Sequence, residues 1–251
     1  MNPILSNKTI LITGGTSRLG SLLVEKATLE GAKVYLTYHQ NREEAKRLEK
    51  LGAVCFSLDL SHPAATIDFA KQLKEKISNL DILIHNAAAV RDHSLSNLTE
   101  EEWDYVMAVD LKAPFLLTKE LLPLLFKQEI RGKENHKTKK ILMLTSRTAL
   151  HGGFGVSNYS AAKAGLIGLM KSLAQELGRK KILVNAVNPG FMRSAMTRSM
   201  PPEAVEANLA ASPLQNYSSP AEVADFLVYL CSDMMQQVTG QIFHFESRGV
   251  S

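Results

Sequence analysis

The sequence predicts a doubly wound α/β fold, with a seven-stranded parallel sheet and helices on both of its faces. Two observations predict this class. Short β-branched or leucine-rich segments alternate with longer amphipathic ones, and 45% of the 251 residues are hydrophobic while 22% are charged. This composition excludes collagen-like, low-complexity and wholly disordered proteins. Because no linker, composition break or internal repeat divides the chain, we expect one domain over residues 1–251.

Short apolar segments predict the strands, and amphipathic periodicity predicts the helices between them. The expected strands are residues 9–13, 33–38, 53–58, 81–86, 141–146, 182–188 and 241–246. The expected helices are residues 18–30, 42–51, 63–78, 100–126, 158–179 and 220–232. Two helices carry start signals, because Thr99 precedes three glutamates and Ser219 precedes a proline.

Two segments lie outside this alternation. Residues 191–215 are rich in Met, Ala, Ser and Pro, and we expect a small mobile substrate lid there. Residues 127–140 hold six basic and two acidic residues, an excess equal to the net charge of +4 of the whole chain. The six basic residues are Lys127, Arg131, Lys133, Lys137, Lys139 and Lys140. So small an excess gives no indication of a nucleic-acid partner.

The cysteines and the N-terminus indicate the compartment. Cys55 and Cys231 lie in apolar contexts and cannot build a disulfide framework, so we expect buried thiols in a reducing cytoplasm. The N-terminus lacks the basic and apolar regions of a signal peptide, and no segment approaches the roughly 18 apolar residues of a membrane span. We therefore expect a cytoplasmic protein without a membrane anchor.

A glycine-rich turn follows the first expected strand. Residues 13–20 read Thr-Gly-Gly-Thr-Ser-Arg-Leu-Gly and lead directly into a helix, which is the context of a dinucleotide-binding turn. Glycine permits close backbone approach to a pyrophosphate, and the helix N-terminus offers free N–H groups. The turn therefore predicts a Rossmann-type nucleotide site, with an ordinary strand-to-helix loop as the alternative.

The end of the second expected strand indicates which dinucleotide would bind. Residues 37–42 read Thr-Tyr-His-Gln-Asn-Arg, so no carboxylate stands there to accept hydrogen bonds from an adenosine ribose 2′-hydroxyl. A 2′-phosphate is favoured instead, with Arg18, His39, Asn41 and Arg42 as candidate partners. The sequence thus favours NADP over NAD, although Arg42 alone is also typical of a solvated helix start.

A serine, a tyrosine and a lysine form the candidate catalytic group. Ser146 ends the fifth expected strand, and Tyr159 and Lys163 are four residues apart, which places them on one face of a helix. A neighbouring ammonium favours the phenolate and lowers a tyrosine pKa from its usual value of about 10. Lys163 is therefore expected to make Tyr159 usable as an acid or base at neutral pH. A tyrosine and a lysine at this spacing are, however, usually just a helix surface.

Taken together, these segments resemble the short-chain dehydrogenase/reductase family over essentially the whole chain and in the family's order. The resemblance rests on the glycine turn, Asp59-Leu60, residues 85–88, Ser146, residues 159–163 and Asn188-Pro189-Gly190. It implies an NADP-dependent oxidoreductase that forms a homotetramer or homodimer, uses no metal, and transfers hydride between a nicotinamide and a carbonyl or alcohol. Ser146 would polarise the carbonyl oxygen, Tyr159 would donate its proton, and Lys163 would bind the nicotinamide ribose.

The resemblance also implies a set of cofactor contacts. These are Gly14, Thr16, Ser17, Arg18, Leu19, Gly20, His39, Asn41, Asp59, Leu60, Asn86, Ala87, Ala88, Tyr159, Lys163, Pro189, Gly190, Met192 and Ser194. Two of them have simpler interpretations, because Asp59 is also placed to cap the following helix and Pro189-Gly190 is also a plain loop former.

Three positions depart from the family pattern. Arg18 stands where the family often has Gly or Ala, which resembles the pteridine reductase branch, in which an arginine serves the NADP phosphate. Asp110, which we count with the catalytic residues, replaces an Asn that holds a water linking the lysine to solvent. Its charge is expected to change the proton relay and to raise the pKa of Lys163 and Tyr159. Residues 246–249 read Glu-Ser-Arg-Gly where Asp-Gly-Gly is common, a change expected to alter subunit packing.

Several stretches indicate the substrate. Residues 86–92, 102–103, 159–168 and 189–198 look most like the 3-oxoacyl-acyl-carrier-protein reductases of fatty acid biosynthesis, which implies NADPH-dependent reduction of a 3-oxoacyl thioester. The basic segment 127–140 and Lys180 would then dock the acidic carrier by electrostatic steering, unless they are a solvated helix end and loop. Arg18 keeps a pteridine or other small-carbonyl reductase as an alternative, and Asp110 keeps a catalytically weak cofactor-binding regulator as a third.

Overall fold

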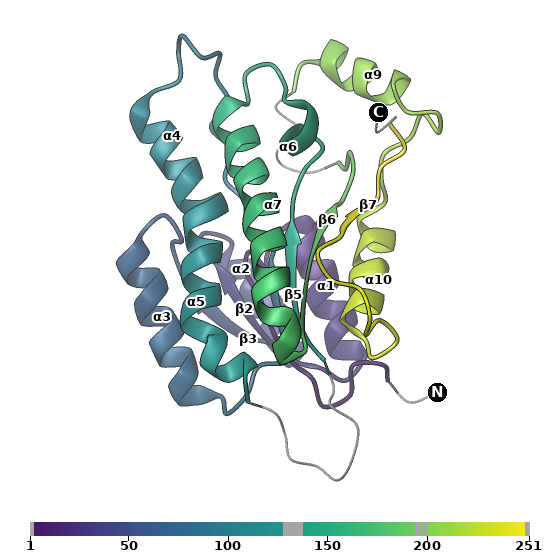
Figure 1. Cartoon of the computed structure of the whole chain (residues 1–251). Helices are drawn as coiled ribbons and strands as arrows, with labels where there is room; N and C mark the ends of the chain where they lie inside the picture. The colour runs from purple at the N-terminus through teal and green to yellow at the C-terminus, as the bar shows by residue number, and fades with distance from the viewer. Residues whose placement is uncertain (1–2, 128–137, 194–196, 198–199, 249–251) are drawn as a thin grey trace.

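The computed structural model describes residues 3–127, 138–193, 197 and 200–248 (Figure 1). Within these residues, seven parallel strands form one sheet in the order β3-β2-β1-β4-β5-β6-β7. The strands are β1 (Thr9–Ile12), β2 (Lys33–Tyr38), β3 (Val54–Ser57), β4 (Ile82–His85), β5 (Lys139–Leu144), β6 (Ile182–Asn188) and β7 (Ile242–His244). The strand order reverses between β1 and β4, which is where sheets of this type bind ligands.

Helices cover both faces of this sheet (Figure 1). One layer holds α1 (Arg18–Leu29), α2 (Arg42–Lys50) and α10 (Pro220–Cys231), and α1 packs on α10. The other layer holds α3 (Pro63–Lys76), α4 (Glu100–Met107), η1 (Ala108–Lys112), α5 (Ala113–Leu125) and α7 (Ser157–Leu177). Shorter helices are α6 (Thr148–His151), η2 (Gly178–Lys180) and α9 (Pro202–Ala210). The predicted doubly wound fold class is confirmed.

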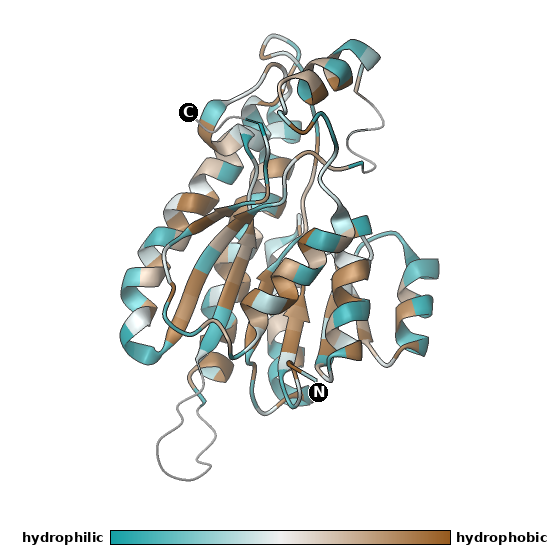
Figure 2. Cartoon of the chain, turned by 90° about the vertical axis from the view of Figure 1, so that its right-hand side faces the viewer, coloured by the Kyte–Doolittle hydropathy of each residue, from teal (hydrophilic) through white to brown (hydrophobic). Residues whose placement is uncertain are grey.

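Two hydrophobic cores enclose the sheet, one on each face. Leu11, Leu83 and Ile141 point toward the layer of α3, α5 and α7, whereas Ile12 and Ile84 point toward α1 and α10. All five side chains are fully buried. Figure 2 shows the strands as hydrophobic and the outward sides of the helices as hydrophilic. Because both faces are buried, the strands are almost continuously apolar, and this is why the sequence revealed them.

The expected strands agree with the structure to within two residues at each end, and the largest shift is at β5. This strand begins at Lys139, where residue 141 was expected. Lys139 Nζ donates to Asp81 Oδ1 at 2.6 Å, and Lys140 Nζ donates to the carbonyl oxygens of Leu230, at 2.7 Å, and Ser232. Their exposed fractions are 6% and 2%.

The prediction that Lys139 and Lys140 belong to an exposed basic surface is therefore wrong. Two strand residues between packed layers are covered, and a buried ammonium needs polar partners, which both lysines have. Lys180 ends η2 just before β6, at the edge of the sheet opposite the carboxyl ends of the strands. Arg131, Lys133 and Lys137 lie outside the described residues.

The expected helix over residues 100–126 is interrupted by a π-helical turn, η1. The N–H of Ala113 donates to the carbonyl of Ala108, five residues earlier. Pro114 has no N–H to donate to Asp110 four residues before it, and its ring crowds that carbonyl. The α-helical hydrogen-bond pattern therefore cannot continue there, and a wider turn replaces it.

Residues 191–215 were expected as a mobile lid and contain one regular element, α9, among the residues described. This helix lies beyond the carboxyl ends of the strands, close to the end of the chain (Figure 1). Its mobility stays a prediction. Among the helices of the described part of the chain, none is long and apolar enough to cross a membrane.

Candidate active site

A cavity of about 870 Å³ opens at the carboxyl ends of the strands. It brings together most of the residues singled out in the sequence. These are Gly14, Thr16, Ser17, Arg18, Leu19, His39, Asn41, Asp59, Leu60, Asn86, Ala87, Ala88, Tyr159, Lys163, Pro189 and Met192. They come from the segments that follow β1 to β4 and β6, and from α7. One cavity therefore contacts both the glycine turn and the Tyr-Lys pair.

Other expected residues lie beside this cavity. Gly20 and Gly190 do not line it, and each packs too closely for a side chain: a Cβ would lie 2.4 Å from Gly14 O at Gly20, and 2.1 Å from Phe245 O at Gly190. Arg42 begins α2 and is exposed, outside the lining. Ser194 lies outside the described residues.

The glycine turn is held in shape by Asn86. The Asn86 side-chain amide donates to the carbonyls of Thr13, at 3.0 Å, and Gly14, at 2.9 Å. Gly14 has a φ of +63°, which glycine adopts without strain. Ser17 caps α1, since its hydroxyl accepts from Gly20 N–H at 3.1 Å. The N-terminus of α1, with its positive dipole end, thus lies at the cavity wall.

The ends of β2 and β3 form the next part of the wall. His39 Nε2 lies 3.5 Å from Asp59 Oδ2, and Asp59 Oδ1 accepts hydrogen bonds from the N–H and hydroxyl of Ser61, at 2.9 and 2.7 Å. Burial alone would raise the pKa of Asp59. The hydrogen bonds from Ser61 and the charge of His39 outweigh burial, so the pKa of Asp59 lies below its usual value. Asp59 does not cap α3, because His62 precedes the helix and no side chain caps it; Asp59 instead orders the turn before α3 and lines the cavity.

The catalytic candidates meet at the start of α7. Lys163 is buried, its Nζ donates to the Leu144 carbonyl at 3.1 Å, and it lies 5.5 Å from the centroid of the Tyr159 ring. Ser146 does not line the cavity, and its hydroxyl accepts from the N–H and hydroxyl of Thr148, at 3.2 and 3.0 Å. A hydrogen bond with Ser146 lowers the pKa of Tyr159. Ser146 and Lys163 thus both act on the Tyr159 phenol.

Asp110 contacts this group from η1. It is fully buried in the π-helical turn η1 and does not line the cavity. Its Oδ2 lies 3.1 Å from Lys163 Nζ, and its Oδ1 accepts from Ala89 N–H at 2.7 Å. The departure from the family's Asn therefore places a buried ion pair between η1 and α7. π-Helical turns are frequent at functional sites.

The pKa of Tyr159 is raised above its usual value, opposite to the direction that the spacing to Lys163 alone predicts. Burial is the largest cause, Lys163 lowers the pKa and Asp110 raises it. Burial alone would lower the pKa of Lys163. Asp110 and Tyr159 outweigh burial and raise this pKa above its usual value, so the lysine stays protonated. The expectation that Asp110 raises both pKa values agrees with these directions.

Three residues that support the site were not predicted from the sequence. Asn158 is buried, donates to the Arg91 carbonyl at 2.9 Å and accepts from Tyr159 N–H at 2.8 Å, so it fixes the start of α7. Arg91 and Arg193 line the cavity. The signal available for Asn158 was a polar residue directly before the tyrosine, whereas the arginines look like ordinary surface charges.

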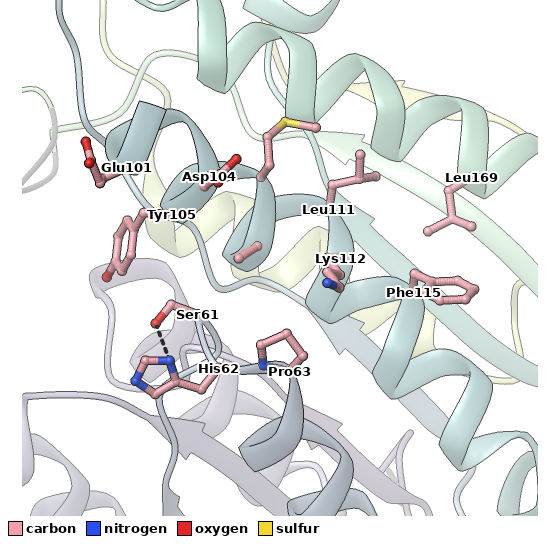
Figure 3. Close-up of a pocket in the computed structure, with 12 residues that line it drawn as sticks. Ser61, His62, Pro63, Glu101, Asp104, Tyr105, Leu111, Lys112, Phe115 and Leu169 are labelled. Atoms are coloured by element: carbon pink, nitrogen blue, oxygen red, sulfur yellow. Dashed lines mark hydrogen bonds between the residues drawn. The ribbon is translucent and has the colours of Figure 1, made fainter. Parts of the chain in front are cut away.

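A second cavity, of about 820 Å³, lies outside this site (Figure 3). It is bounded by α4, η1 and α5 on one side and by residues 61–63 on the other. Leu111, Phe115 and Leu169 form an apolar end, and Glu101 and Asp104 lie at the other end (Figure 3). No residue proposed for catalysis or cofactor binding contributes to it.

Comparisons with known proteins agree with this arrangement. A family model described as enoyl-(acyl carrier protein) reductase matches residues 16–248. A 3-oxoacyl-[acyl-carrier-protein] reductase FabG of Thermotoga maritima is 34% identical over 243 residues, which are 95% of this chain and 96% of that protein. The Pseudomonas aeruginosa RhlG/NADP active-site complex has a TM-score of 0.87 and 28% identity, and covers 98% of both chains. A short-chain dehydrogenase of Burkholderia cenocepacia in complex with NADP has a TM-score of 0.85 and 26% identity, and covers 97% of this chain and 98% of that one. The chain therefore belongs to the short-chain dehydrogenase/reductase family of oxidoreductases.

Proposed function

We propose that this protein is an NADPH-dependent reductase that converts a 3-oxoacyl thioester, carried on acyl carrier protein, to its 3-hydroxyacyl form. The observation that carries the proposal is the single cavity that contacts both the glycine turn and the Tyr159–Lys163 pair. The similarity to 3-oxoacyl-[acyl-carrier-protein] reductases over 95% of the chain supports the thioester substrate.

The residues of the cavity fit NADP. The free N–H groups of α1 suit a pyrophosphate. Arg18, His39 and Asn41 line the part of the cavity next to the end of β2 and suit a 2′-phosphate. The one carboxylate nearby, Asp59, is engaged by Ser61 and His39. When bound, the reduced nicotinamide supplies a hydride.

The chain's own residues would then complete the reduction. The Ser146 hydroxyl donates a hydrogen bond to the substrate's carbonyl oxygen and polarises it. Tyr159 donates the phenolic proton that converts this oxygen to a hydroxyl as negative charge develops on it. Lys163, held by Asp110 and the Leu144 carbonyl, places a positive charge beside the phenolate that remains. The balance is one hydride and one proton added to one C=O bond.

The test is NADPH oxidation by the purified protein with an acetoacetyl thioester, both carrier-linked and free. Dihydropterin and a quinone serve as competing substrates, and NADH serves as the cofactor control. We expect turnover of the thioester with NADPH, and more of it when the thioester is carrier-linked. Turnover of dihydropterin alone would overturn the thioester assignment in favour of the pteridine reductase that Arg18 indicates.

Replacing Arg18 tests the cofactor assignment. We expect Arg18→Ala to raise the KM for NADPH about 10- to 100-fold, because a lost hydrogen bond to a charged group costs about 1.5–3 kcal/mol. The KM for NADH should stay within about twofold, since NADH has no 2′-phosphate. Steady-state kinetics with both cofactors measure the ratio, and equal increases for both would contradict a role in phosphate recognition.

We also propose that the protein forms a homodimer or homotetramer, as the family resemblance implies. The cavity beside α4 and α5 supports a self-association face there, because Phe115 at its apolar end is 45% exposed (Figure 3). Sedimentation velocity should show an oligomer for the parent and a smaller species for Phe115→Glu. A parent that sediments as a monomer over the micromolar range would refute the proposal.

A further inference from the structure

The last described residues of the chain, 245–248, form hydrogen bonds with the segment between β6 and α10 that contains α9. These residues are called the tail below. Arg248 is the centre of this contact, with a side chain only 11% exposed, and the Glu246 side chain is 2% exposed. Arg248 donates from Nε to Glu246 Oε1 at 2.8 Å and from Nη2 to Glu246 Oε2 at 2.5 Å. Its Nη1 donates to Asn208 Oδ1 on α9. One guanidinium therefore joins the tail to α9.

The same guanidinium begins a stack that ends at the cavity wall. It lies 5.1 Å from the centroid of the Phe191 ring. Phe191 stacks on Tyr217 with 5.2 Å between ring centroids and 19° between planes. The guanidinium of Arg193 lies over the Tyr217 ring, 4.7 Å from its centroid. Since Arg193 lines the cavity, contacts run without interruption from the tail to the site.

Further bonds fix both ends of this segment to the tail. The N–H of Ser218 donates to the Phe191 carbonyl at 2.8 Å, and the Ser218 hydroxyl donates to the Phe245 carbonyl at 3.1 Å. The hydroxyls of Ser212 and Ser247 hydrogen-bond to each other. Residues 245–248 thus hold the two points where the segment leaves and rejoins the body of the protein.

The charge of Arg147 also acts on Glu246 in the tail. Burial alone would raise the pKa of Glu246. Hydrogen bonds from Arg248 and the charge of Arg147 outweigh burial, so the pKa of Glu246 lies below its usual value and the carboxylate is ionised. Arg147 directly follows Ser146. Glu246 therefore pairs with the arginine that contacts α9, and its pKa is also lowered by the charge of the arginine that follows Ser146.

We infer that Arg248 is a positioning residue for substrate: through Asn208 and the Phe191–Tyr217 stack it holds Arg193 and the α9 segment at the mouth of the site. The inference rests on the proposed function for its kinetic consequence and on the contacts alone for its structural one. An arginine suits this place because its planar fork both stacks on a ring and donates to two acceptors, which a lysine cannot do. Residues 246–248 are also where the chain departs from the family's common Asp-Gly-Gly.

Loss of the ordered α9 segment is expected to raise the KM for substrate. If Arg248→Ala leaves only about a tenth of the molecules with the segment in place, apparent substrate affinity falls about tenfold while bound substrate reacts as before. We therefore expect KM for the thioester to rise about tenfold, with kcat within about twofold. The Kd for NADPH should change by less than about threefold, because Arg18 and His39, proposed to hold its 2′-phosphate, come from the segments after β1 and β2. Arg248→Lys should recover only part of the effect, and Arg179→Ala, an exposed arginine on η2, is the matched control.

A second measurement needs no activity. Tryptic cleavage after Arg193 should be about tenfold faster in Arg248→Ala than in the parent, since the Arg193 side chain is then no longer held over Tyr217. Asn208→Ala keeps the Glu246–Arg248 pair and removes the link from Arg248 to α9, together with the bond from the Asn208 amide to the Ala204 carbonyl, so it guards against an Arg248 variant that fails to fold. It should show the same two changes to a smaller extent, because the contact of Arg248 with Phe191 remains, and the melting temperature should be unaltered.

The outcomes separate the two proposals. Faster cleavage after Arg193 without any thioester turnover in the parent would support the positioning role and reject the proposed substrate. Unchanged cleavage and unchanged KM in both variants would overturn the positioning role whatever the activity. A fall in kcat equal to the rise in KM, with a lowered melting temperature in Asn208→Ala, would likewise overturn it in favour of a purely structural contact.

Discussion

Tyr159→Phe is expected to lower kcat/KM for carbonyl reduction by about 10²- to 10⁴-fold, which is the usual contribution of a positioned general acid. The substitution removes one oxygen and leaves the ring, so the packing of α7 and the 5.5 Å approach of Lys163 Nζ to the ring should persist. What is lost is the only proton that Tyr159 can give to the substrate oxygen. In the proposed mechanism Ser146 still polarises that oxygen, so some residual turnover is expected.

Binding and stability provide the controls for this loss. The Kd for NADPH, measured by fluorescence titration, should change by less than about threefold, and the melting temperature should be close to that of the parent. Ser146→Ala should lower kcat/KM by a smaller factor than Tyr159→Phe, because it removes polarisation but leaves the acid. A Tyr159→Phe protein that keeps more than a tenth of the parent's kcat/KM would assign proton donation to another group.

The sequence predicted the parts of this molecule that depend on neighbouring residues. Parallel strands covered on both faces are continuous apolar segments, so β2 and β6 were predicted with their observed ends. The glycine turn and the pair Tyr159 and Lys163 are local spacings, and the structure places most of the turn and both side chains of the pair on one cavity. In each case the information lies within about ten consecutive residues.

What the sequence did not reveal depends on residues far apart in the chain. Lys139 looks like an exposed basic residue until its partner Asp81, 58 positions earlier, is known. The π-helical turn η1 was hidden because Pro114 is compatible with several ways of interrupting a helix. The role of Arg248 depends on three separate segments that meet only in the folded protein. Pairings of this kind are set by topology, which no local pattern contains.

Two substitutions at Asp110 separate its structural role from its electrostatic role. Asp110→Leu should lower the free energy of unfolding by about 3–5 kcal/mol, because it leaves the Lys163 ammonium buried without its charged partner. Asp110→Asn should lower it less, since the single amide oxygen can still accept from either Ala89 N–H or Lys163 Nζ, which the carboxylate contacts through separate oxygens. Urea unfolding of the two variants and the parent measures both differences, and equal stability of Asp110→Leu and the parent would mean that the ion pair is dispensable.

The Asn variant then isolates the effect on Tyr159. The charge of Asp110 raises the pKa of Tyr159, so removing that charge lowers this pKa. In the proposed mechanism reduction needs the protonated phenol, so it should decline as pH rises through the Tyr159 pKa. In Asp110→Asn this decline should begin at lower pH. Oxidation of the hydroxy product needs the phenolate, so its rise should also move to lower pH. Profiles of kcat/KM in both directions measure the shift, and coincident profiles of the two proteins would show that Asp110 does not tune the acid. A shift of both profiles in the expected direction would mean that the buried carboxylate keeps the tyrosine protonated over a wider pH range, which favours reduction.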